Sequence, residues 1–229
     1  MAYFSEQEMT RRLDRLKRCM EEKAVDAVLV TSVHNTLYYS NFWMIPWGRL
    51  QGLVIPREGE PVLIAPRIED DRPVRMIGNG SVFSDVRIYS DNTSAIDGWV
   101  GLVGEILGER GITTGRIGIE EDNVSVTLHK ALCAALTGAE LVEMGYSMMC
   151  EQMLKSEEEV TLIRNGAEIC DIGAQAFVDA LTEGVTEVQI ARAAVSAMCC
   201  CQPLCPANPR MTVADTLRPA SQALSRAMA

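Results

Sequence analysis

The stretch GLVIPREGEPVLIAP, residues 52–66, contains two short apolar runs that are separated by the polar residues REGE. Each run has the length of a buried strand, and the polar segment between them contains Gly59. Glycine adopts the positive φ angles that tight turns require, at little steric cost. The stretch therefore predicts a β-hairpin with its turn at Gly59.

Helical and strand patterns alternate on both sides of this hairpin. Before it, Ser5 and Glu8 form a capping-box pattern for an amphipathic helix that ends near Lys23. A buried strand in VDAVLVTS is followed by a short helix that begins near Ser32 or Asn35. After the hairpin, the predicted elements are a strand at 82–90, a helix at 96–109, a strand at 115–120, a helix at 126–136 and a strand at 139–144. This alternation predicts an α/β domain whose sheet is covered by helices, with strand order left open.

The pattern becomes purely helical further along. Ser156 and Glu159 form a second capping box, and an apolar stripe at helical spacing then runs from Val160 to Leu181. A further helix begins at Thr186. Because little follows that could cover these two helices, we expect the stripe to be partly exposed.

The pattern fails after Met198. Four prolines fall within the last 31 residues, and no apolar period is sustained there. We interpret residues 199–229 as a divergent, disordered tail, and a shift of reading frame is one hypothesis for its origin.

Composition excludes several classes of function. The chain has 229 residues, with 31 acidic against 21 basic side chains and a formal charge of −10. Such a charge disfavours binding to nucleic acid or to anionic membranes. No apolar run approaches the roughly 20 residues of a membrane span, and the start lacks the features of a signal peptide, so a cytoplasmic location is expected.

Metal and cofactor sites are not expected either. Four of the eight cysteines crowd into positions 199, 200, 201 and 205, but no second Cys or His pair accompanies them as zinc sites require. Phosphate-binding glycine motifs are also missing from the sequence. We therefore predict no metal ligands and no cofactor.

An aromatic and cationic segment precedes the hairpin. NFWMIPWGRL, residues 41–50, places Trp47 and Arg49 on a predicted loop. A guanidinium group meets a carboxylate through two parallel hydrogen bonds, and an indole face stacks on cations or shields an ion pair from water. The residues alone leave two interpretations open: a substrate-binding pair, or a Trp packed on its own sheet beside an ordinary surface Arg.

Several segments resemble, in order, the creatinase members of the pita-bread family, which also contains prolidases and aminopeptidases that act before proline. They are TSVHNTLYYSNF, WGRLQGLVI, RIGIEEDNVS, AELVEM and MLKSEEEVTLIRNGAEICDIG. The resemblance covers residues 1–198. It implies a creatinase-like N-terminal α/β domain at 1–147, with a mixed sheet flanked by helices, and the first helices of a truncated pita-bread catalytic domain at 148–198.

The resemblance also implies a function. Creatinases hydrolyse creatine with water to sarcosine and urea without a metal, and their catalytic histidine and carboxylates would lie beyond Met198. They are homodimers in which the N-terminal domain of one subunit closes over the active site of the other. Trp47 and Arg49 match the positions that give creatinases an aromatic wall, usually Phe, and an arginine for the substrate carboxylate. The chain is thus expected to be inactive alone, with no catalytic residue of its own.

The remaining polar candidates are interpreted structurally. The place of His34 in the resemblance suggests that it and Asn35 hydrogen-bond the turn after the first strand. We expect His129 to face solvent, and the acidic residues 120–122 to form a solvated turn before a helix.

Two other functions stay open beside the creatinase-like hydrolase. One is the N-terminal fragment of a metal-dependent X-Pro peptidase of the prolidase or aminopeptidase P type. The other is a non-catalytic dimerisation domain. The pairing of Trp47 with Arg49 favours the creatinase-like function, because a dipeptidase does not require an arginine there.

Overall fold

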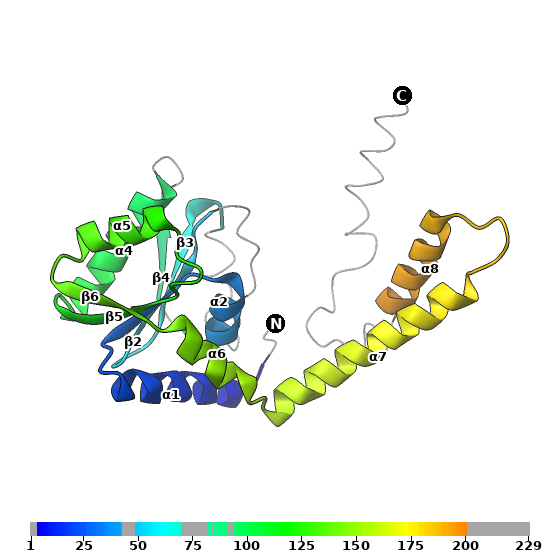
Figure 1. Ribbon diagram of the computed structural model, residues 1–229, viewed down its shortest axis with the longest axis horizontal. Coiled ribbons are helices and arrows are strands. Elements are labelled where there is room, and N and C mark those ends of the chain that lie inside the picture. Colours follow the sequence, from blue (N-terminus) through cyan, green and yellow to red (C-terminus); the bar gives the residue numbers. More distant parts are fainter. Residues whose placement is uncertain (1–3, 43–48, 70–81, 84, 91–93, 201–229) are drawn as a thin grey trace. The chain divides into compact units, whose positions relative to one another are not determined.

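The computed structural model describes residues 4–42, 49–69, 82–83, 85–90 and 94–200 (Figure 1). Contacts divide the chain into two compact units, and the boundary along the sequence falls between Leu154 and Lys155. The first unit carries a six-stranded sheet and the second carries two long helices. Each unit is described separately below.

The sheet of the first unit is mixed, as the family resemblance implies. Its strands are β1 (Ala27–Val30), β2 (Gly52–Pro56), β3 (Val62–Pro66), β4 (Asp85–Tyr89), β5 (Gly115–Ile119) and β6 (Ala139–Glu143). Their order across the sheet is β4-β3-β2-β1-β5-β6. The β1–β2 and β2–β3 pairs are antiparallel, and the other three pairs are parallel. The predicted hairpin is confirmed as β2–β3, and Gly59 has a φ of 102° in its turn.

Three helices cover one face of the sheet. They are α1 (Glu6–Glu22), α2 (Val33–Ser40) and α6 (Gly145–Met153). Side chains alternate between the faces of a strand, so β1 sends Val28 and Val30 to this side. They join a buried cluster with Leu16 and Met20 of α1 and Met148 of α6.

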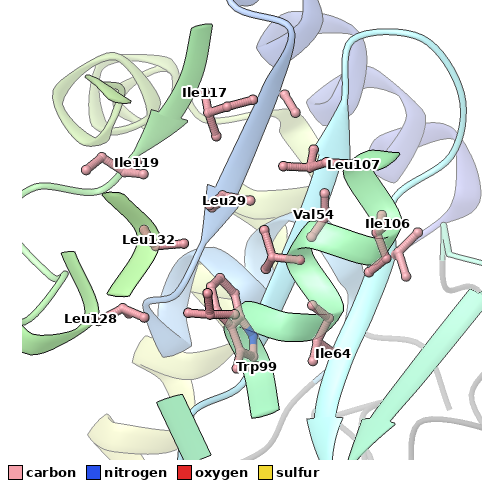
Figure 2. Close-up of a cluster of buried hydrophobic side chains, with 14 of the residues drawn as sticks. Leu29, Val54, Ile64, Trp99, Ile106, Leu107, Ile117, Ile119, Leu128 and Leu132 are labelled. Atoms are coloured by element: carbon pink, nitrogen blue, oxygen red, sulfur yellow. The ribbon is translucent and has the colours of Figure 1, made fainter. Parts of the chain in front are cut away.

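The opposite face is covered by α4 (Ala95–Glu109) and α5 (Val126–Ala135). Figure 2 shows this second core, in which the fully buried Trp99 of α4 packs with Leu29 of β1 and Leu132 of α5. Close backbone approach here requires glycine, because a Cβ at Gly52 would lie 2.0 Å from the carbonyl oxygen of Val30. The first unit therefore has three layers, with one apolar core on each side of the sheet.

Helix α6, like the short 3₁₀ helix η1 (Arg67–Glu69), was not predicted from the sequence. Its apolar period is short, and only Gly145 and Met148 are buried along it. Its start is fixed by Glu143, whose carboxylate accepts a hydrogen bond of 2.8 Å from the backbone N–H of Tyr146. Its other end is tied to α1 by an ion pair of 2.5 Å between Arg15 and Glu151. Polar contacts with other elements thus compensate for the weak apolar pattern.

The second unit contains α7 (Glu157–Asp179) and α8 (Glu187–Cys200), which pack against each other. The predicted capping box is confirmed: Ser156 accepts from the backbone N–H of Glu159, whose carboxylate accepts from the N–H of Ser156. The expected exposure of the apolar stripe is also found. Exposed large apolar residues of these helices are Ile163, Ile172, Phe177, Val178, Val188 and Val195.

This exposure predicts binding of a hydrophobic dye by the native chain. We expect anilinonaphthalene sulfonate to fluoresce on binding, because apolar patches of this kind attract such dyes. Replacing both Ile163 and Phe177 with serine is expected to lower that signal by about half. The matched control is Val126→Ser, which removes an exposed apolar side chain from the first unit and leaves most of the signal. An unchanged signal in the double variant contradicts the prediction.

None of the helices within the described residues is long and apolar enough to cross a membrane. The predicted tail begins at residue 199, but α8 continues through Cys200, and residues 201–229 lie outside the described residues.

Candidate functional site

The carboxyl ends of β1 and β5 lie side by side, because these strands are parallel and Leu29 pairs with Ile119. In open α/β sheets this end of the strands commonly carries the functional residues. Here β1 runs into the segment Thr31-Ser32, which begins α2, and β5 runs into Glu120. Six polar side chains from these segments, from α2 and from α6 meet at this point.

The carboxylate of Glu120 is the centre of this cluster. Its side chain is buried, with 1% of the residue surface exposed. It accepts five hydrogen bonds: from the backbone N–H and hydroxyl of Thr31, from the backbone N–H (2.8 Å) and hydroxyl (2.5 Å) of Ser32, and from Nδ2 of Asn35 (2.6 Å). Hydrogen bonds to a charged acceptor are stronger than neutral ones, so the cluster compensates for burying the charge.

Two amides extend the cluster to neighbouring elements. Asn123 donates from Nδ2 to the hydroxyl of Thr31 at 2.9 Å. Gln152 of α6 donates from Nε2 to Oδ1 of Asn35 at 2.6 Å. The network therefore joins β1, α2, α6 and the segment after β5, and we call it the Glu120 network.

The geometry gives Glu120 a structural role in joining β1 and α2 to the end of β5. Its oxygens are occupied by donors from its own fold, so it is not available as a base for a substrate. The prediction of a solvated acidic turn is wrong for Glu120, because five donors replace the water that a buried carboxylate loses. It is right for Glu121 and Asp122, which are exposed.

The two histidines behave differently from Asn35. Asn35 is hydrogen-bonded at the turn after β1, as predicted. His34 is exposed, and its ring makes no hydrogen bond within the part of the chain that the structure describes, so its predicted role in that turn is wrong. The physical reason is that the α2 helix turns position 34 away from the sheet while it turns position 35 toward Glu120. His129 is exposed, as predicted.

Two residues with a fixed backbone, Asn41 and Leu50, precede and follow Arg49 along the chain. On one side, α2 ends at Asn41, whose left-handed conformation (φ 60°) caps the helix and whose Nδ2 donates to the carbonyl of Phe4 at 3.1 Å. On the other, the carbonyl of Leu50 accepts a hydrogen bond of 2.8 Å from the hydroxyl of the buried Tyr89. Arg49 itself is exposed just before β2. Trp47 lies outside the described residues.

A buried ion pair supports the outer side of α2. The guanidinium of Arg12 is fully buried, bonds the Glu8 carboxylate at 2.8 Å and donates to the carbonyl of Tyr38 at 3.0 Å. It also lies over the rings of Phe4 and Tyr38, at 3.7 and 4.1 Å from their centres. Burial alone would raise the pKa of Glu8, but hydrogen bonds from Arg11 and Arg12 outweigh it and lower the pKa to about 2.

Comparison with known proteins shows which family has this architecture. The Creatinase/Prolidase N-terminal domain family matches residues 12–149, which include the whole sheet and the Glu120 carboxylate. The chain belongs to the creatinase/prolidase family. A creatinase from Bacillus sp. strain B-0618 is 37% identical over 195 residues, which are 85% of this chain and 46% of the relative.

Solved structures of the creatinase/prolidase family share the fold. An X-Pro aminopeptidase from Thermotoga maritima MSB8 has a TM-score of 0.65 at 19% identity, covering 81% of this chain and 48% of that one. The dipeptidase PepE from Mycobacterium ulcerans has a TM-score of 0.61 at 24% identity, covering 86% and 51%. The chain therefore spans about half the length of these relatives.

No group of three or more His, Cys, Asp or Glu side chains that could hold a metal ion exists among the described residues. The Glu120 network of this creatinase/prolidase domain was not predicted from the sequence. The available signal was the placement of polar residues, Thr31 and Ser32 in one case and Glu120 in the other, directly after two buried strands.

Proposed function

We propose that this chain is the substrate-binding N-terminal part of a creatinase-like hydrolase, which converts creatine and water to sarcosine and urea. The observation that carries the proposal is the 37% identity to a creatinase over 85% of the chain. In this proposal Arg49 binds the substrate carboxylate, and Trp47 supplies an aromatic wall beside it.

The surroundings of Arg49 support this role. The carbonyl of Leu50, the residue next to Arg49, is held by the hydroxyl of Tyr89, so Arg49 adjoins a fixed point of the sheet. Arg49 is exposed just before β2, and a guanidinium fork is the donor geometry that matches a carboxylate. The family resemblance adds a site completed by a second subunit, and we extend the proposal to a cytoplasmic homodimer.

In this proposal each predicted domain has its own role. Residues 1–147 bind substrate and dimerise, residues 148–198 begin the catalytic domain, and residues 199–229 diverge from it. Neither His34 nor His129 is assigned a catalytic role, and both belong to the first unit. We therefore expect purified chain incubated with creatine to release no urea above the uncatalysed rate. Sustained urea release would contradict this expectation.

Replacing Arg49 with alanine tests the substrate role in a full-length form of the enzyme. We expect KM for creatine to rise about 30-fold or more, which corresponds to the ~2 kcal/mol lower bound for truncating a desolvated charge pair. Arg49→Lys is expected to recover part of the loss, since it keeps the charge without the fork. The matched control is Arg57→Ala, because Arg57 pairs with Asp26 at 3.0 Å on the opposite end of β2. An unchanged KM in Arg49→Ala removes Arg49 from the site.

An X-Pro peptidase is the second candidate, favoured by the fold shared with an X-Pro aminopeptidase. The same full-length form distinguishes the two activities: urea from creatine without added metal supports the first, and free proline from X-Pro dipeptides with added metal supports the second. A chain that dimerises by light scattering, while its full-length form turns over neither substrate, would support a non-catalytic dimerisation domain.

A further inference from the structure

Helix α5 presents a cysteine and a histidine that neither the proposed function nor the core of the domain uses. Cys133 and His129 lie one helical turn apart, and both side chains are exposed. The sulfur of Cys133 is 3.7 Å from Nδ1 of His129. The buried side chains of Leu128 and Leu132 hold α5 against the sheet. The backbone positions of Cys133 and His129 are therefore fixed relative to each other.

The side chains beside Cys133 are of the kinds that assist thiol chemistry. A thiolate is the nucleophilic form of cysteine, and neighbouring histidine or lysine side chains stabilise it. The imidazole of His129 is close enough to accept the thiol proton. Lys130, which is also exposed, lies one turn before Cys133 on the same side of the helix and adds a positive charge.

Cys170 is the exposed cysteine for comparison, because no His or Lys stands one helical turn from it. Cys170 is exposed in the middle of α7, and Gly166 and Ala174 stand one turn to either side of it. Among the described residues, the Cys133 sulfur is the one found in contact with a histidine ring. Cys133 and Cys170 are therefore both exposed, but of these two cysteines Cys133 has a histidine beside its sulfur.

We propose that Cys133 is a modification site that forms mixed disulfides with low-molecular-weight disulfides, with His129 as the positioning base. His129 takes the thiol proton, and the Cys133 thiolate attacks one sulfur of the disulfide. A new bond forms between Cys133 and that sulfur while the original S–S bond breaks. The departing thiolate then takes up the proton from His129, so no further oxidant is needed.

The experiment treats the reduced chain with oxidised glutathione in the presence of a metal chelator and follows each cysteine by peptide mass spectrometry. We expect Cys133 to react about tenfold faster than Cys170. His129→Ala is expected to reduce the rate at Cys133 toward that of Cys170 and to leave Cys170 itself unchanged. Lys130→Ala is expected to have a smaller effect in the same direction.

Two further measurements make the outcome decisive. Circular dichroism verifies that the variants are folded, as their exposed positions lead us to expect. Alkylation of the unmodified chain by iodoacetamide gives a second comparison of Cys133 with Cys170 that needs no variant. Equal rates at the two cysteines, or an undiminished rate at Cys133 in His129→Ala, overturn the proposal.

Discussion

Replacing Glu120 with alanine is expected to lower the free energy of unfolding of the first unit by about 3–5 kcal/mol, the range for removing one partner from a buried charged network. The substitution removes the acceptor of five hydrogen bonds and leaves the donors of Thr31, Ser32 and Asn35 buried without it. Because Gln152 of α6 is bonded to Asn35, we also expect α6 to lose protection against hydrogen exchange.

Two variants define the cause of this loss. Glu120→Gln keeps the shape but turns an amide N–H₂ toward groups that are themselves donors, so most of the loss should remain. Glu121→Ala removes the exposed neighbouring carboxylate and should change the stability by less than about 0.5 kcal/mol. The measurement is urea unfolding followed by far-UV circular dichroism. A Glu120→Gln variant as stable as the parent would show that the network does not hold the fold.

Replacing Glu8 with glutamine should destabilise the first unit by about 3 kcal/mol at pH 7, which is the linkage value for a shift of the Glu8 pKa from 4.5 to about 2. The buried Arg12 then keeps its bond to the Tyr38 carbonyl and its contacts with two rings, but loses its carboxylate partner. Stability is again measured by urea unfolding.

The pH dependence identifies the Glu8 carboxylate as the source of this stability. Its pKa is lower in the folded chain than in the unfolded chain, so the unfolded state binds the proton more tightly. The contribution is therefore complete above pH 4.5 and is lost as the pH falls toward about 2. The difference between the parent and Glu8→Gln should shrink across this range. Glu6→Gln, at an exposed position in the same helical turn, is the control, and a constant difference between parent and Glu8→Gln would contradict the assignment.

Elements with a strong local pattern could be predicted from the sequence. The β2–β3 hairpin has two apolar runs and a glycine turn, and α7 has a capping box at Ser156 followed by a long apolar period. In both cases the interactions that fix the element are made by residues near one another along the chain. Helix α6 escaped prediction because its stabilising partners, such as Arg15 of α1, are distant in sequence.

For the candidate site, too, contacts between residues distant in sequence could not be predicted. The substrate-binding role of Arg49 stays a prediction, since exposure just before β2 is all that the structure gives for it. The Glu120 network was not predictable from spacing, because Glu120 and Ser32 are brought together only when β1 and β5 pair in parallel. A run of acidic residues after a strand has the same appearance whether its first member points to solvent or into the fold.

The position of β1 in the sheet has a consequence for how the chain acquires its structure. Its antiparallel partner β2 follows soon after it, whereas its parallel partner β5 comes much later in synthesis. Closing the shorter loop costs less entropy, so the β1–β2–β3 meander should form first, on the ribosome or in refolding. Until β5 arrives, the fully apolar segment Ala27–Val30 has one unpaired edge. A nascent chain stalled before Gly115 is therefore the species most prone to aggregate, through that edge.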